Sequence, residues 1–179
     1  MKTIKSLLCL SLVCLFAACS STQSLQEYYI DNTENPNFLM LDVPTSVLNL
    51  ENADLNDSQR EALGSLKKLN ILAFKKTTEN TAAFKTEKAN VKAILSDDKF
   101  IQLMRMNTSY GRATIKYLGT EDAIDEVIIY GDSDEKGFAL IRVLGNDMNP
   151  AHMMQLLQAI EKSDYDGEGL KDLGKLFQG

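Results

Sequence analysis

The sequence predicts an α+β fold, a mostly antiparallel sheet with helices packed on one face. Two observations carry this prediction. Strand-like segments follow one another through residues 100–144 of the C-terminal half, and short polar or glycine-containing turns separate them. Short turns between neighbouring strands favour an antiparallel meander, here of about four strands. Helical patterns precede and follow this run, so helices are available to cover the sheet.

In the first half of the domain, the sequence predicts alternating helices and strands. Residues 25–30 carry apolar side chains on one helical face, and Pro36 ends that helix. A strand is expected over residues 38–43. A helix then starts at Ser58, which has capping-box spacing to Glu61. A second strand follows over residues 69–74, and residues 80–95 carry the longest helical pattern, with its apolar stripe at Phe84, Val91 and Leu95.

The second half supplies the meander. Residues 100–106 predict a strand with a bulge or a late helix end, because Gln102 and Arg105 break the alternation. Residues 112–117 alternate cleanly, and the next strand places Val127 on one side. Residues 138–144 are apolar on both faces except for Arg142, which is typical of a central strand. A last helix opens at Asn149-Pro150, with apolar residues at Met153, Leu156, Leu157 and Ile160.

The N-terminal segment has the pattern of a targeting sequence. Lys2 and Lys5 precede an apolar run that ends in Ala17, Ala18 and Cys19, which is the order of a secretory signal peptide. The run is too short to span a bilayer as a helix. We therefore expect a signal peptide over residues 1–18, a modified cysteine and polar tether over residues 19–24, and a single α+β domain over residues 25–179.

Residues 16–19, Phe-Ala-Ala-Cys, resemble the lipobox of bacterial lipoproteins. That resemblance implies cleavage before Cys19 and attachment of acyl chains such as palmitate to it, so that the protein is anchored to a membrane without crossing it. Ser20 follows where an aspartate tends to retain lipoproteins in the inner membrane. The expected location is therefore the outer membrane, facing the periplasm, with the cell surface or the inner membrane as alternatives.

Charge and cysteine content exclude several classes of function. After removal of residues 1–18, 17 basic residues stand against 25 acidic ones, a net charge of −8. An acidic chain without a basic run is a poor nucleic-acid binder, and an anionic membrane surface repels it, so the lipid must supply the anchoring. Cys19 is the one cysteine of the mature sequence. The domain thus has no disulfide, thiol nucleophile or cysteine metal site.

Motifs for catalysis or metal binding are incomplete. Residues 164–169, Asp-Tyr-Asp-Gly-Glu-Gly, begin like a calcium loop, but Lys175 takes the place of the bidentate glutamate, and whether this loop binds calcium stays open. A zinc site at His152 would lack a second histidine as a co-ligand. A serine-hydrolase site would lack a nucleophile, because the sequence has no Gly-x-Ser-x-Gly turn. Adjacent acids such as Asp125-Glu126 point to opposite strand faces. We expect no catalytic residues, no metal and no cofactor, and a hydrolase built on carboxylates alone is the remaining enzymatic alternative.

One face of the meander is the candidate partner surface. Its expected members are Ile128, Tyr130, Phe138 and Leu140, which share a face if the register follows the short turn. If no helix covers them, they form an apolar patch of the kind that binds a partner. The predicted function is thus a membrane-anchored, non-enzymatic lipoprotein that binds an envelope protein in assembly or signalling. The alternative is a small-ligand-binding lipoprotein with an apolar cleft between sheet and helices.

Hydrophobic patterns along the mature chain resemble an uncharacterised lipoprotein family of Bacteroidetes-type bacteria, classed as a domain of unknown function. The resemblance rests on four segments, residues 100–104, 114–117, 125–129 and 138–145. It implies a lipoprotein and supplies no catalytic residues.

Overall fold

The computed structural model describes residues 23–48, 54–108, 111–120 and 122–162. Helices α2 (Leu25–Asp31), α3 (Asp57–Ser65), α4 (Thr81–Leu95) and α5 (Pro150–Lys162) accompany six strands and a short 3₁₀ helix at Thr45–Leu48. The strands are β1 (Phe38–Pro44), β2 (Leu66–Lys75), β3 (Ile101–Thr108), β4 (Gly111–Gly119), β5 (Ile124–Ser133) and β6 (Gly137–Met148). The α+β prediction is confirmed.

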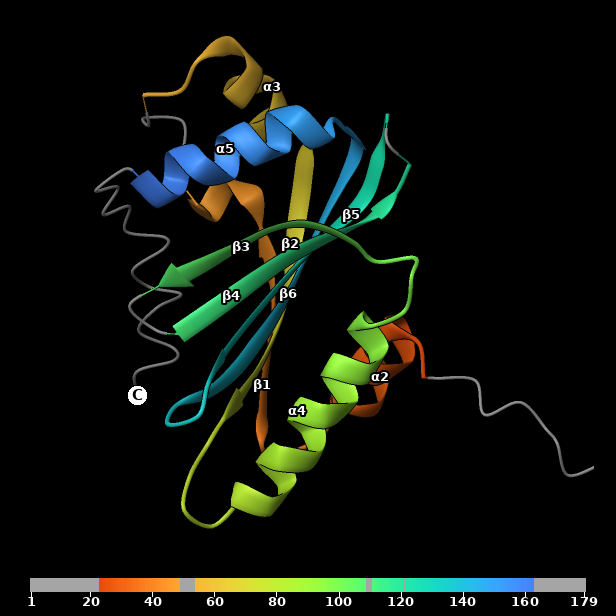
Figure 1. Cartoon of the computed structure of the whole chain (residues 1–179), viewed down its shortest axis with the longest axis vertical. Helices are drawn as coiled ribbons and strands as arrows, with labels where there is room; N and C mark the ends of the chain where they lie inside the picture. Colours follow the sequence, from red (N-terminus) through yellow and green to blue (C-terminus); the bar gives the residue numbers. More distant parts are fainter. Residues whose placement is uncertain (1–22, 49–53, 109–110, 121, 163–179) are drawn as a thin grey trace, which may run out of the picture.

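A single antiparallel sheet runs in the order β1-β2-β6-β5-β4-β3 (Figure 1). Strands β3 to β6 form the predicted meander, and the register shift between Gln102 and Met104 confirms the expected bulge. The β1–β2 hairpin adds two strands beside β6, with Leu72 opposite Leu140. The sheet therefore has six strands where the meander pattern predicted about four.

Helices cover both faces of the sheet, which corrects the expectation of one covered face. Helices α2 and α4 pack on the face that carries Leu72, Ile128 and Leu140. Helices α3 and α5 pack on the face that carries Ile71 and Val127, at the end of the sheet drawn uppermost in Figure 1. The physical reason is that β2 buries consecutive side chains from Ile71 to Phe74, so both of its faces need a partner.

Local signals place the helix ends. Ser24 caps α2 in a capping box with Glu27, whose backbone N–H donates to the Ser24 hydroxyl at 3.2 Å. The box of α3 is formed by Asn56 and Gln59, two residues before the predicted Ser58 and Glu61. Asn149 caps α5 as predicted, because its Oδ1 accepts from the His152 backbone N–H at 3.0 Å.

Candidate functional site

Arg142 is the one charged residue within the apolar stretch of residues 138–144 on the central strand β6, and its charge needs a partner. It lies on β6 opposite Ile128 of β5, and Glu126 is the next residue of β5 on the same sheet face. Its Nε lies 2.5 Å from Glu126 Oε1 and its Nη2 lies 2.8 Å from Glu126 Oε2, a bidentate ion pair. Both side chains are nearly buried, at 12% and 11% exposure. Removing either partner would leave an uncompensated charge.

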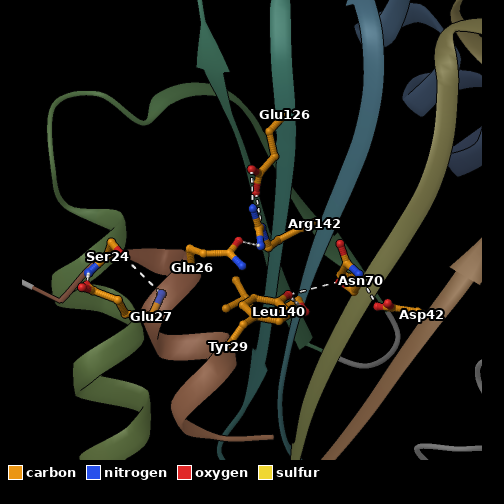
Figure 2. Close-up of polar contacts among 9 residues, drawn as sticks. All are labelled: Ser24, Gln26, Glu27, Tyr29, Asp42, Asn70, Glu126, Leu140 and Arg142. Atoms are coloured by element: carbon orange, nitrogen blue, oxygen red, sulfur yellow. Dashed lines mark hydrogen bonds and ion pairs between the residues drawn. The ribbon is translucent and has the colours of Figure 1, made fainter.

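Helix α2 closes over this ion pair (Figure 2). Gln26 Oε1 accepts from Arg142 Nη1 at 2.7 Å, and the guanidinium carbon lies 5.2 Å from the centre of the Tyr29 ring. The Tyr29 hydroxyl donates to the Leu140 carbonyl oxygen at 2.7 Å and lies 3.1 Å from that of Asn70. We call these four side chains, Gln26, Tyr29, Glu126 and Arg142, the α2 clamp.

The electrostatics of the α2 clamp favour fixed charges. The hydrogen bonds to Glu126 raise the pKa of Arg142 above its already high usual value. Burial raises the pKa of Tyr29 above its usual value, so its hydroxyl stays protonated. Arg142 directs Nε, Nη1 and Nη2 at acceptors, and both Glu126 oxygens accept from it. This arrangement holds α2 in place on the sheet.

A second charged cluster joins α4 to the end of the β5–β6 hairpin. Lys88 Nζ lies 2.5 Å from Asp132 Oδ2 and 2.7 Å from Asp134 Oδ1, and Lys92 Nζ lies 3.5 Å from Asp132. Burial lowers the pKa of Lys88, but its hydrogen bonds to the two aspartates outweigh burial and raise it. The carboxylates of Asp132, at the end of β5, and of Asp134, in the turn that follows, thus pair with a lysine.

The predicted partner surface is wrong, although its four members do share a face. Ile128, Tyr130, Phe138 and Leu140 are 0–5% exposed, because α2 and α4 cover them. Aromatic rings fill this layer. Phe74 stacks on Phe138 at 5.5 Å between ring centres, and Phe84 lies 6.2 Å from Phe138. The strand pattern revealed the shared face but carried no information on which helix would cover it.

Of the other sequence candidates, His152 lies within the described residues, on the opposite face of the sheet from the α2 clamp. His152 lies in the first turn of α5, with Nδ1 3.3 Å from Glu61 Oε2 of α3, and its side chain is 26% exposed. Cys19 and residues 164–169 lie outside the described residues. Within the described ranges, no group of three or more His, Cys, Asp or Glu side chains is arranged to hold a metal ion. In the same ranges no helix is both long and apolar enough to cross a membrane.

No motif in the sequence marks the α2 clamp as a site. The signal that could have found it was Arg142 itself. A charged residue between apolar neighbours on a central strand needs a buried partner, and Glu126 was the acid on the adjacent strand. The contribution of Gln26 and Tyr29 depends on where α2 packs, which no local pattern specifies.

The fold and the clamp define an α+β domain built on one antiparallel sheet with helices on both faces. The chain belongs to the family described as domain of unknown function DUF4252, whose model matches residues 28–156. The matched range runs from α2 to α5 and contains Tyr29, Glu126 and Arg142. No curated protein and no solved structure matches the chain.

Proposed function

We propose that this protein is a lipid-anchored lipoprotein of the bacterial cell envelope, of the Bacteroidetes type, that binds a protein partner in envelope assembly or signalling and catalyses no reaction. The observation that carries the proposal is the distance along the chain between Cys19 and the domain. Four residues separate Cys19 from Ser24, the N-cap of α2. Five residue steps reach about 17 Å when extended. Acyl chains on Cys19 would therefore hold α2 beside the bilayer.

The α2 clamp connects the helix nearest to Cys19 with the central strands of the sheet. Gln26 and Tyr29 lie on the element next to the anchor, while Arg142 and Glu126 lie on central strands of the sheet. A pull or a constraint on Cys19 is passed through α2 to β5 and β6. This supports a module that is presented to a partner in a restricted orientation at the membrane.

The charged side chains of the two clusters pair with one another, which supports binding over catalysis. Arg142 is satisfied by Glu126 and Gln26, and Lys88 by Asp132 and Asp134. A catalytic site keeps an acid, base or nucleophile available to substrate. The net charge of −8 for residues 19–179 further supports anchoring through lipid, since the acidic domain gains nothing from an anionic surface. Ser20 after Cys19 supports the outer membrane, facing the periplasm.

Metabolic labelling with palmitate tests the anchor. We expect label on the wild-type chain and on Cys14→Ala, a matched control in the segment removed on cleavage, and none on Cys19→Ala. Equal labelling of Cys19→Ala and wild type would refute the lipoprotein assignment. In a second arm, detergent-solubilised membranes are used to capture the tagged chain. One stoichiometric envelope protein supports the binding role, and capture of the chain alone contradicts it.

A further inference from the structure

Strand β3 is an edge of the sheet that can accept a further strand. Within the described residues it pairs with β4 alone and stands last in the strand order (Figure 1). After the bulge, Met104 to Thr108 pair residue by residue with Ile115 to Gly111. In an antiparallel ladder, every second residue of an edge strand directs its N–H and C=O groups away from its neighbour. This part of β3 therefore presents a regular row of backbone donors and acceptors.

The opposite edge of the sheet differs from β3 in two respects. Strand β1 ends in Pro44, which has no N–H to donate, and the 3₁₀ helix follows at once. Strand β1 also carries Asp42, whose side chain is 64% exposed. Strand β3 has neither a proline nor an acidic residue. The two edges would thus select added strands of different charge.

One face of the β3–β4 pair is polar and cationic, although the chain has a net charge of −6. Asp132 of β5 lies opposite Arg112 of β4 on this face, but its carboxylate already pairs with Lys88 and Lys92. Lys116 donates to the Leu95 carbonyl oxygen at the end of α4, at 2.6 Å. The β3–β4 polar face consists of six residues, none of them buried or acidic: Gln102, Arg105, Asn107, Arg112, Thr114 and Lys116.

Two guanidinium groups of the β3–β4 polar face are available to an anion. Arg105 and Arg112 are exposed, and neither forms an ion pair or a side-chain hydrogen bond in the part of the chain that the structure describes. Arg105 lies opposite Thr114, and Arg112 lies opposite Asn107. The two arginines therefore occupy diagonal positions, about 7–8 Å apart at the backbone. Like charges so placed repel each other, and a carboxylate near both relieves that repulsion.

The other face of β3 is apolar along the same edge. Met104 and Met106 are half-buried, and Ile101 at the start of the strand is 40% exposed. Their neighbours on β4, Ile115 and Ala113, are buried, so the accessible apolar surface here is confined to the edge strand itself. Side chains of a strand alternate between the two faces of a sheet. An added strand would thus meet cations with one set of side chains and apolar groups with the other.

We propose that the β3 edge binds an extended segment of a partner protein in which acidic and apolar side chains alternate, as an added strand of the sheet. Its acidic side chains lie beside Arg105 and within reach of Arg112, and its apolar side chains lie beside Met104 and Met106. The inference rests on the proposed binding role and names the chemistry of the partner. A second copy of this chain fits less well, because β3 offers no acidic residue to another β3.

Peptide binding to the mature chain with Cys19→Ser tests the proposal. The probe is a fluorescent eight-residue peptide that alternates Glu and Val, which matches the length of β3. One control peptide has four Glu followed by four Val, and the other alternates Lys and Val. We expect the alternating acidic peptide to bind most tightly and to slow hydrogen exchange at β3 amides but not at β1. No binding, equal binding of the acidic peptides, or protection of β1 would overturn the proposal.

A pair of substitutions tests the role of the two arginines. Arg105→Gln with Arg112→Gln should weaken binding of the alternating acidic peptide by about fivefold or more, while circular dichroism shows an unchanged fold. The matched control is Arg60→Gln with Lys85→Gln, at exposed positions on α3 and α4, which changes the net charge equally. It should bind the peptide as the wild-type domain does. Equal affinities of the two double variants would contradict the proposal.

These measurements do not depend on the lipid anchor or on capture of an envelope protein. If Arg105→Gln with Arg112→Gln captures an envelope protein as well as the wild type does, the binding role stands and the assignment of the β3 edge is wrong. If the alternating acidic peptide binds as expected and no envelope protein is captured, the β3 edge still selects such a strand and the envelope role fails. Protection of β3 that grows with protein concentration, without peptide, would assign the edge to a second copy and contradict the proposal.

Discussion

Two tyrosines lie buried on the same face of the sheet system, and their hydroxyl groups have opposite fates. Tyr29 donates to the Leu140 carbonyl oxygen, whereas the buried hydroxyl of Tyr130 makes no hydrogen bond within the described part of the chain. A hydrogen bond to a buried carbonyl stabilises a fold modestly, and a buried unpaired hydroxyl costs free energy. Removal of the hydroxyl group is therefore expected to destabilise the fold at Tyr29 and not at Tyr130.

We expect Tyr29→Phe to lower the free energy of unfolding by about 1–2 kcal/mol, since it leaves two carbonyl oxygens without this donor. The matched variant Tyr130→Phe should be neutral or slightly stabilising. Urea denaturation of the mature Cys19→Ser chain measures both. Destabilisation by Tyr130→Phe equal to that by Tyr29→Phe would show that the Tyr130 hydroxyl is in fact satisfied.

At the scale of elements, α2 is held to the sheet by polar contacts as well as by apolar packing. Leu25, Tyr28 and Tyr29 supply the buried apolar face of this seven-residue helix. So short a helix does not persist without tertiary contacts. The Tyr28 hydroxyl donates to Glu87 of α4 at 2.8 Å, and the α2 clamp joins the helix to β5 and β6. We therefore expect the ion pair to contribute to the local stability of α2.

We expect Glu126→Gln to loosen α2, because it leaves the nearly buried Arg142 guanidinium without its bidentate counter-ion. The predicted cost is about 2–3 kcal/mol. Hydrogen exchange should show faster exchange at the α2 amides, with a smaller change in α4. Glu135→Gln, in the exposed turn before β6, is the control. Unchanged protection of α2 in Glu126→Gln would mean that apolar packing alone holds the helix.

At the scale of the whole molecule, the ion pairs of Lys88 with Asp132 and Asp134 stabilise the fold less at both low and high pH than near neutral pH. The hydrogen bond from Lys88 lowers the pKa of Asp134. Its contribution to the free energy of unfolding is therefore present above the unfolded-state pKa of Asp134 and is lost as pH falls through the folded-state pKa. The pKa of Lys88 is raised, so its contribution is present below the unfolded-state pKa and is lost as pH rises through the folded-state value.

We therefore expect Lys88→Gln to lower Tm by about 2–4 °C near neutral pH and by less at both the acidic and the alkaline end. Differential scanning calorimetry across pH measures this. Lys85→Gln, an exposed position on the same helix, should follow the wild-type curve throughout. A Tm difference that stays constant with pH would show that Lys88 acts through packing of its methylene stem on Phe84, which lies 5.5 Å below its ammonium.

How far the sequence predicts this molecule depends on the range of the interactions involved. The meander was predictable because its strands pair with neighbours across short turns, as Ile129 does with Ile141. The pairing of β2 with β6 was not, since Leu72 and Leu140 are brought together by packing rather than by a turn. The same limit applies to the site. The charge of Arg142 in an apolar stretch indicates a buried partner. The position of Gln26 beside it depends on how α2 packs on the sheet, which the local sequence does not specify.

The position of β2 between β1 and β6 also fixes an order of assembly. Lys75 pairs with Gly137, so the inner edge of β2 has no strand to pair with until β6 is present. Closing such a long loop is slow compared with forming the local hairpins of the meander. We therefore expect a fragment of the chain that ends before residue 148 not to fold stably. In kinetic terms, we expect the domain to complete its folding only after β6 has been synthesised and has paired with β2.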